Sequence, residues 1–500
     1  MPAKDEKAGF IALSRFGFGS RGDGDLAAAS LDPRGFLRAE IEPPGAALLA
    51  GPGLPDSNAA LQILFAQQDA EKAAREMKAA LAQTASNPSQ PAAAPQDAPQ
   101  IIVLAPQAPA NPPPNAAMTP PANPAPPKPP SPQQIIFRAE ALARFRRAYE
   151  ARAGLVERLV AFWSNHFALS MSKGGPTSIT AGVFEREAIR PHVLGRFADM
   201  LLAAESHPAM LFYLDAQQSV GPDSPVGTKQ NRGRNENLGR EILELHTLGV
   251  NGGYSQADVI ALSDMLTGWR FAGRDQKFGP PGAFIFQANV HEPGAQKLLG
   301  ADYPPGAVDQ AQAALLALAR RPETARHLAF KLAKHFVADA PPPVLVERLA
   351  QVFLTTDGDL RAVTLALIDA PESFAAPPMK MRDPWEFVVA SARLLGHAPD
   401  EPGPVISALD MLGQPLWRPP GPNGFPDDAA AWASPDGIRT RLDLASQWAI
   451  RLRDPPDPRE LCDAALGAAA SPETRQAVSR AETRPQGLAL LLMAPEAQRR

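Results

Sequence analysis

Most of this sequence repeats apolar residues every three to four positions, in stretches rich in strong helix formers. That period places the apolar side chains on one face of a helix. Several stretches end at Gly or Pro, which terminate helices. β-branched alternation is scarce, apart from a candidate hairpin at 283–294. We therefore predict a mostly α fold, a multi-helix bundle with little β structure, from the periodic segments 57–83, 135–170, 188–215, 256–269, 322–339, 342–356 and 360–374.

Residues 86–133 interrupt this pattern with a stretch made almost entirely of Pro, Ala, Asn, Gln and Ser. Such a composition cannot bury enough apolar surface to offset the entropy of ordering. We predict a disordered insertion rich in polyproline II conformation, between an N-terminal helical part (1–85) and the rest of the same helical domain (134–500). The alternative is a proline-rich recognition tract.

The composition limits the classes of partner and site. A chain of 500 residues with 45% hydrophobic residues can bury a large core. A net charge of -4 gives no basic surface for nucleic acid, and 6% aromatic residues argue against a base-stacking surface. The single Cys462 excludes an intrachain disulfide and a thiolate zinc site.

The first twenty residues are mixed in charge and lack the apolar run of a signal peptide. No window reaches the roughly 18 apolar residues that a membrane-spanning helix requires. The default expectation is therefore a soluble cytoplasmic protein without a membrane partner, or an exported one if the true start lies upstream.

The common enzyme signatures GxxxxGK[ST], GxSxG, HExxH and paired CxxC are absent from the sequence. One GxGxxG pattern occurs at Gly17, Gly19 and Gly22. No βαβ pattern follows it, as a dinucleotide site would require. We interpret these glycines as a helix stop and a turn.

The segment 155–170 places His166 on the apolar side of a helix, with Glu157 and Arg158 on the other side. Two interpretations stay open for this histidine. It is either a core residue bonded to a backbone carbonyl, or a buried ligand or general base whose pKa is lowered by desolvation.

The segment 235–254 (NENLGREILELHTLGVNGGY) predicts a short helix with an apolar stripe of Leu238, Ile242 and Leu245. A polar arc carries Glu236, Asn237, Arg240, Glu241 and Glu244. His246 lies across the stripe from Glu241 and Glu244, so these groups cannot bind one metal ion as an i, i+4 pair would. A capping box at Ser255 and Asp258 begins the next helix, giving an αα-hairpin. The arc is either a solvated surface of ion pairs (Glu236–Arg240 and Arg240–Glu244) or one wall of a pocket.

Two further regions carry candidate site residues. His291 and Glu292 precede a Pro-Gly turn, a common setting for loop histidines in sites. The turn-rich segment 413–436 contains Trp417, Arg418 and Trp432, which either line a groove or pin the loop to the helices.

Several segments together resemble a bacterial domain-of-unknown-function family, number eighteen hundred. The resemblance implies a helical fold, no established activity, and an insertion within one domain. It also implies that some members are exported and often accompany a second family resembling alkaline phosphatases and sulfatases. This chain departs from the usual pattern at Gly239, where Ala is commoner, and at Glu292, where Asp is commoner. The segments that carry the resemblance are RFGFG (15–19), ERLVAFWSNHF (157–167), 235–269, HEPGAQKLLG (291–300), HLAFKLAKHFVAD (327–339) and PPGPNGFPDDAAAW (419–432).

Two functional hypotheses follow. The first is a binding or assembly protein that presents the acidic helix and the aromatic loop to a protein partner, a phosphatase/sulfatase-like neighbour by the resemblance. Its contact residues would be Asn237, Trp269, Trp417, Arg418 and Trp432. The second is a hydrolase-like enzyme with Glu236, Glu241 and Arg240 as catalytic groups and a divalent metal ion as cofactor. The metal ligands would be His166, His246 and His291.

Overall fold

The computed structural model describes residues 5–85 and 129–500. The chain is 62% helical with 4% in strands, so the prediction of a mostly α fold is confirmed. Within the described residues, no helix is both long enough and apolar enough to cross a membrane.

The N-terminal elements confirm the interpretation of the three glycines. Helix α1 (Glu6–Ile11) continues into the π-helix η1 (Ala12–Phe16), and the glycines lie between it and α2 (Asp25–Ala29). Gly17 ends the helical run, while Gly19 and Gly22 have positive φ angles in the turn that follows. The segment before these glycines is helical and not a strand. Helix α3 (Pro33–Ile41) comes next.

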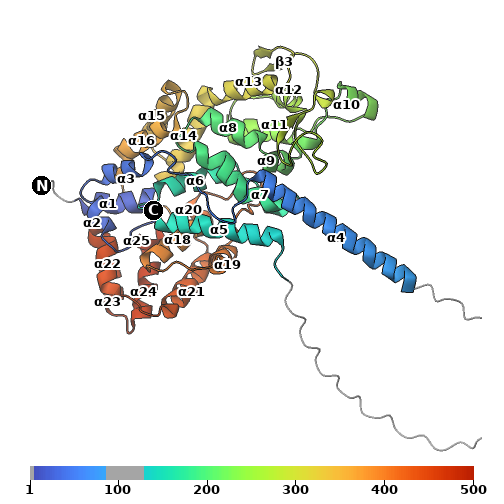
Figure 1. Cartoon of the computed structure of the whole chain (residues 1–500). Helices are drawn as coiled ribbons and strands as arrows, with labels where there is room; N and C mark the ends of the chain where they lie inside the picture. The colour runs from blue at the N-terminus through green and yellow to red at the C-terminus, as the bar shows by residue number, and fades with distance from the viewer. Residues whose placement is uncertain (1–4, 86–128) are drawn as a thin grey trace, which may run out of the picture.

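Helices α4 (Ser57–Ala85) and α5 (Pro132–Glu150) flank the predicted insertion. Of the insertion, residues 86–128 lie outside the described residues. Ser131 caps α5 in a capping box with Gln134, so this helix begins at Pro132, before the predicted boundary of 134. Both helices contact α7 (Thr177–Phe184). Figure 1 shows α4 running outward from the body of the protein, and residues 69–83 are exposed.

The predicted helical run 135–170 is interrupted at Gly154, whose φ is 101°. Helix α6 (Leu155–His166) starts there and is buried on both sides. The polar side expected from the sequence carries Glu157 and Arg158, which are 4% and 1% exposed. They are buried because each meets an opposite charge, Glu157 at Arg190 and Arg158 at Glu386.

The middle of the chain builds a layer of short helices. The predicted capping box of Ser255 and Asp258 is confirmed at the start of α12. The elements are η2 (Met171–Lys173), α7, η3 (Glu185–Ile189), η4 (Arg190–His192), α8 (Phe197–Ser206), α9 (Pro208–Tyr213), η5 (Ala216–Gln218), α10 (Pro225–Gln230), α11 (Asn237–Glu241), η6 (Ile242–His246) and α12 (Gln256–Leu266).

The prediction that Leu245 belongs to the apolar stripe of the 235–248 helix is wrong. Leu245 is half-buried, whereas Leu243 and His246 are fully buried. The reason is the π-helix η6, whose wider turn shifts the phase of the side chains relative to an α-helix. Gly239 lets α11 approach α12 closely, because a Cβ there would lie 2.3 Å from Ser263 Oγ.

The strands of the described residues form two antiparallel pairs. Strand β1 (Trp269–Phe271) pairs with β2 (Phe284–Phe286), and β3 (Gln296–Leu298) pairs with β4 (Ala301–Tyr303). The prediction of a hairpin within 283–294 is therefore wrong. Strand β2 pairs with the preceding strand β1, and Ala288–Val290 forms the 3-10 helix η7. A two-residue hairpin turn favours positive φ angles, which Leu299 and Gly300 supply between β3 and β4.

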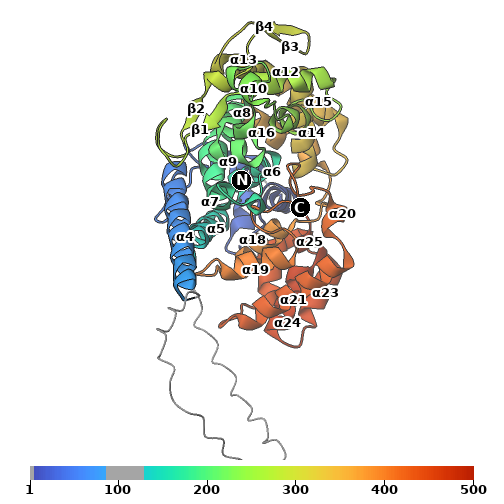
Figure 2. The ribbon, with the colours of Figure 1, turned by 90° about the vertical axis from the view of Figure 1, so that its right-hand side faces the viewer.

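The helices that follow β4 include several that pack against the N-terminal helices. One apolar core extends from Phe10 to Leu492, and Figure 2 shows the C-terminal end beside α18 and α25. The elements are α13 (Val308–Ala319), α14 (Pro322–Phe336), α15 (Pro343–Thr355), α16 (Leu360–Asp369), α17 (Glu372–Ala375), α18 (Pro384–Leu394), α19 (Gly403–Met411), α20 (Ala429–Trp432), α21 (Pro435–Arg451), α22 (Pro458–Leu466), η8 (Gly467–Ala469), α23 (Pro472–Ser479), α24 (Arg484–Met493) and α25 (Pro495–Gln498).

Candidate functional site

A cavity of about 760 Å³ lies between α6, α14 and the loop 413–428. Its size falls in the range of small-molecule sites. From each helix, residues two turns apart reach the cavity, at positions i, i+7 and i+8. The polar residues that line it include Arg158, Asn165 and His166 from α6, His327, Lys331, Lys334 and His335 from α14, and Asp427 from the loop.

The two helices run antiparallel across the cavity. Arg158, near the start of α6, lies 3.1 Å from Nε2 of His335, near the end of α14. At the other end of α6, His166 meets Lys331, one turn earlier on α14. The cavity therefore has a polar group pair at each end.

Lys331 and His166 form the first pair. Lys331 Nζ lies 2.8 Å from His166 Nδ1, and His166 Nε2 lies 3.1 Å from the carbonyl oxygen of His246. A carbonyl oxygen only accepts hydrogen bonds, so Nε2 carries the imidazole proton. Nδ1 therefore accepts a hydrogen bond from the Lys331 amine, and one tautomer of His166 is fixed.

Burial shifts the pKa of both partners. It lowers the pKa of Lys331 to about 8. Burial, and the nearby charge of Lys331, lower the pKa of His166 well below its usual value, so this imidazole is neutral at pH 7. The bond to a backbone carbonyl is the one expected of a core histidine, and the lowered pKa is the one expected of a buried general base or ligand.

The π-helix η6 supplies the acceptors that orient two cavity histidines. The carbonyl of Leu245 accepts from His327 Nε2 at 3.2 Å, and the next carbonyl accepts from His166. Carbonyls at the end of a helix have no partner within it, so they are free to bond outside groups. The side chain of His246 turns away, with Nδ1 2.8 Å from Oε1 of the equally buried Glu205 but not aligned for a hydrogen bond.

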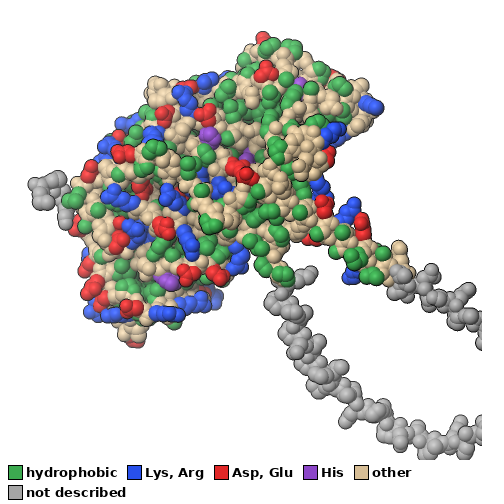
Figure 3. All heavy atoms as spheres, in the orientation of Figure 1, with side chains coloured by type: hydrophobic (Ala, Val, Ile, Leu, Met, Phe, Trp, Pro, Cys, Tyr) green, Lys and Arg blue, Asp and Glu red, His purple; other side chains and the backbone are tan. Residues whose placement is uncertain are grey.

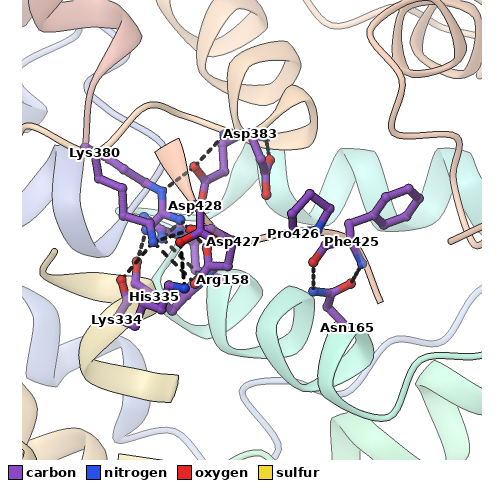
Figure 4. A network of polar contacts seen from close by, with 12 residues as sticks. Arg158, Asn165, Lys334, His335, Lys380, Asp383, Phe425, Pro426, Asp427 and Asp428 are labelled. Carbon is purple, nitrogen blue, oxygen red and sulfur yellow. Dashed lines mark hydrogen bonds and ion pairs between the residues drawn. The ribbon is translucent and has the colours of Figure 1, made fainter. Parts of the chain in front are cut away.

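The other end of the cavity is a dense ion network (Figure 4). His335 Nδ1 lies 3.1 Å from Asp427, and Arg158 contacts both His335 Nε2 and Glu386. Arg500 bridges Glu386 at 2.5 Å and Asp427 at 3.0 Å. Burial lowers the pKa of His335 to about 4. Because both nitrogens of this imidazole already have partners, we interpret this end as a structural network.

The loop is held to α6 by one side-chain amide. Asn165 Nδ2 donates to the carbonyl of Phe425 at 2.9 Å, and the Phe425 amide donates to Asn165 Oδ1 at 2.7 Å (Figure 4). Gly424 makes this approach sterically acceptable. A Cβ there would lie 2.5 Å from the backbone oxygen and from Oδ1 of Asn165, and its φ is 75°.

The predicted catalytic groups lie elsewhere on the protein. Arg240 forms an ion pair with Glu236 at 3.0 Å, and Gln256 donates to the same carboxylate. Burial raises the pKa of Glu241. Glu236, Arg240 and Glu241 are all missing from the lining of the cavity described above.

The structure separates the predicted metal ligands. His291 Nδ1 lies 2.8 Å from the carbonyl of Thr267, beyond the cavity lining, whereas His166 and His246 are neighbours with ring centroids 5.9 Å apart. Across residues 5–85 and 129–500, no group of three or more His, Cys, Asp and Glu residues is arranged to hold a metal ion. The predicted site of three histidines is therefore not assembled, because the β1–β2 segment carries His291 to a different part of the fold.

The predicted binding residues are dispersed as well. Trp417 lines the cavity, while Trp269 is buried in β1, where it meets Phe284 edge-on. Arg418 forms an ion pair with Asp410 at 2.6 Å, and Trp432 Nε1 donates to the carbonyl of Pro426. Asn237 is exposed at the start of α11. Trp417 therefore faces the cavity, whereas Trp432 bonds within its own loop.

Sequence reasoning missed the cavity residues of α14. His327, Lys331 and His335 recur every four residues in the segment 327–339, which places three titratable groups on one face of the helix. That spacing was the available signal. The prediction of a helix over this segment used only the spacing of its apolar residues.

A second polar cluster looks like a catalytic triad but lacks its geometry. His207 Nε2 lies 3.1 Å from both Ser57 Oγ and Glu187 Oε2. Its Nδ1 accepts from the amide of Ala209, so Nε2 carries the proton and cannot take one from Ser57. We interpret this cluster as a structural link between the starts of α4 and α9.

Comparison with known proteins gives one finding. The model of a family described as "Protein of unknown function (DUF1800)" matches residues 11–499. Neither the curated proteins nor the solved structures contain a match to this chain.

Proposed function

Because the chain belongs to the DUF1800 family, whose description assigns no activity, we propose a function from the cavity itself. The protein is an enzyme that binds a small molecule between α6, α14 and the loop 413–428. Lys331 and His166 transfer protons to and from that molecule.

The observation that carries this proposal is the hydrogen bond from Lys331 to His166 inside the cavity. An acid–base group works best when its pKa lies near the operating pH, and the pKa of Lys331 is lowered to about 8. His166 holds the amine in place, and the carbonyl of His246 fixes the imidazole in turn. This chain of base, partner and orienting group is typical of acid–base sites.

The walls of the cavity indicate the kind of molecule it accepts. A ligand here would place an apolar body against these walls and a polar group toward Lys331. The apolar side chains that line the cavity include Phe162, Leu169, Leu248, Phe330, Leu416 and Phe425.

This proposal keeps the enzymatic function predicted from the sequence but assigns it to different catalytic residues. Glu236 and Glu241 are absent from the cavity lining, so proton transfer is assigned to Lys331 instead. A lysine acid–base group serves hydrolysis and isomerisation alike.

Competitive acetylation tests the titration that the proposal requires. The full chain is treated with limiting acetic anhydride between pH 6 and 11, and each lysine peptide is quantified by mass spectrometry. The yield at Lys331 should rise around pH 8, and exposed Lys297 in the same digest is the reference. Identical profiles for the two lysines would overturn the assignment.

Turnover is tested with a metabolite mixture followed by mass spectrometry. The unmodified chain should deplete at least one compound that Lys331→Met leaves untouched. Lys297→Met is the matched control, because that lysine is exposed and its ion pair with the exposed Asp302 is long, at 3.6 Å. Equal depletion by all three proteins would contradict the proposal.

An assembly function is a second candidate, favoured by the exposed outer part of α4. Met77 and Leu81 lie one turn apart and are each 65% exposed. Figure 3 shows apolar and charged side chains side by side along this part of α4. The partner implied by the family resemblance is a phosphatase/sulfatase-like protein. Co-sedimentation with such a protein, lost on Met77→Glu, would support this function.

A further inference from the structure

We propose that Lys331 forms an imine with an aldehyde or ketone that carries an apolar substituent. This inference rests on the proposed function and names the substrate class of the same cavity. The lysine would act as a nucleophile in addition to its role in proton transfer.

The partners of Lys331 distinguish it from the neighbouring lysines. Lys334 pairs with Asp428 at 2.7 Å, and Lys380 pairs with Asp339 at 2.8 Å. Within the described part of the chain, the one hydrogen bond of Lys331 Nζ goes to the neutral imidazole of His166, and no carboxylate lies within ion-pair distance of it. A carboxylate would hold the amine as ammonium, whereas a neutral imidazole does not.

Burial increases the fraction of reactive amine. With a pKa lowered from 10.5 to about 8, Lys331 is neutral in about one molecule in ten at pH 7. That fraction is roughly 300 times the fraction for an unshifted lysine. The amine is therefore available as a nucleophile at neutral pH.

The groups present balance the reaction. The Lys331 nitrogen adds to the carbonyl carbon, a C–N bond forms, and the C=O π electrons move to oxygen. His166 Nδ1, 2.8 Å from the nitrogen, takes the proton from nitrogen and returns it to that oxygen. His166 Nδ1 then takes the remaining proton from the nitrogen and passes it to the carbinolamine hydroxyl, which leaves as water while the nitrogen electron pair completes the C=N bond. No oxidant or reductant is required.

The apolar walls of the cavity select the substrate. Phe162, Phe330 and Leu248 line the cavity around this pair, and a site of about 760 Å³ admits an aromatic aldehyde. An apolar substituent gains free energy by leaving water for these walls.

Reductive trapping tests the inference on the full chain. The protein is incubated with benzaldehyde and sodium cyanoborohydride at pH 7, and a digest is mapped for benzylated lysines. Lys331 should be benzylated at least about 10-fold faster than Lys297. With glyoxylate in place of benzaldehyde, this preference should shrink, because glyoxylate has no apolar body to bury. A rate at Lys331 no greater than at Lys297 would overturn the inference.

A variant of His166 distinguishes imine formation assisted by the imidazole from a reaction that depends only on the exposure of Lys331. His166→Gln should slow benzylation of Lys331 roughly 10-fold or more if the imidazole carries the proton. Circular dichroism and the benzylation rate of Lys297 check that the fold is retained. If Lys331 shows the low-pH acetylation profile but no selective benzylation, imine formation is excluded and acid–base catalysis stands. If neither reaction is selective, both proposals fail.

Discussion

Asn165 of α6 binds Phe425 of the 413–428 loop through both halves of its side-chain amide, one donating and one accepting. These residues are far apart in sequence, and the bond holds one wall of the cavity against another. The contact between this loop and α6 thus depends on a side chain that also lines the cavity.

Asn165→Ala should loosen the loop around Phe425, while the ion pairs of Asp427 continue to hold its end. The loss of two hydrogen bonds should lower the free energy of unfolding by about 1–3 kcal/mol. The Phe425 amide, which donates to Asn165, should exchange its hydrogen faster, as measured by hydrogen–deuterium exchange. Asn237→Ala is the matched control, since Asn237 is exposed, and it should change stability by less than about 0.5 kcal/mol.

Gly424→Ala should disturb the same contact by steric means. The new Cβ would lie 2.5 Å from Asn165, at a φ of 75°. Gly413 has a similar φ of 83° but open space around its Cβ position. Gly413→Ala should therefore cost only the backbone strain, about 1–2 kcal/mol, and Gly424→Ala should cost more. Urea unfolding measures both, and equal costs would contradict the steric argument.

Arg158→Met should strongly destabilise the protein. It removes the partner of Glu386 at 2.9 Å and leaves that buried carboxylate dependent on Arg500. Breaking a buried ion pair in this way costs about 3–5 kcal/mol. Arg326 also lines the cavity, but it is 64% exposed and pairs with exposed Glu347. Arg326→Ala should cost under about 1 kcal/mol, and thermal unfolding of both variants tests the contrast.

The free energy of unfolding should fall as the pH is lowered from about 6.5 to 4. Burial lowers the pKa values of His335 and His327 to about 4, and that of His166 well below its usual value. At these three histidines the unfolded chain binds protons in this pH window that the folded chain does not, so acid favours unfolding; Asp383, whose pKa burial raises to about 6, opposes this as one group against three. Each histidine contributes up to about 1.4 kcal/mol per pH unit, measured by urea unfolding at a series of pH values.

Replacing one of these histidines should reduce that slope. In His327→Gln the slope between pH 6.5 and 4 should fall by about one proton, because glutamine does not titrate. His397→Gln is the control at an exposed position. A slope unchanged by the first substitution would show that His327 is not kept neutral by burial.

The two partners of the site, His166 and Lys331, differed in how far the sequence could predict them. The apolar period placed His166 on the buried side of its helix, and burial at such a position is enough to lower its pKa. Lys331 carried a signal of the same kind, the four-residue spacing with His327 and His335. Only the antiparallel packing of α6 and α14 shows that Lys331 meets His166, because periodicity fixes a face and not its neighbour.

The acidic helix shows the opposite case. Glu236, Glu241 and His246 are crowded in sequence, yet the π-helix η6 changed the direction of the last side chain. His246 contributes its backbone carbonyl to the site and turns its imidazole toward Glu205. Hydrogen bonds that depend on a local change of helix type are not encoded in a simple apolar period.

The sequence by itself determined the mostly α fold, the helix stop at Gly17, the burial of His166 and the capping box at Ser255. All of these depend on residues within a few positions of one another, whose side-chain chemistry acts locally. The tertiary structure decided that α6, α14 and the 413–428 loop enclose one cavity, and that His291 lies elsewhere. Those outcomes depend on which helical faces pack together, a choice made by the summed burial of residues hundreds of positions apart.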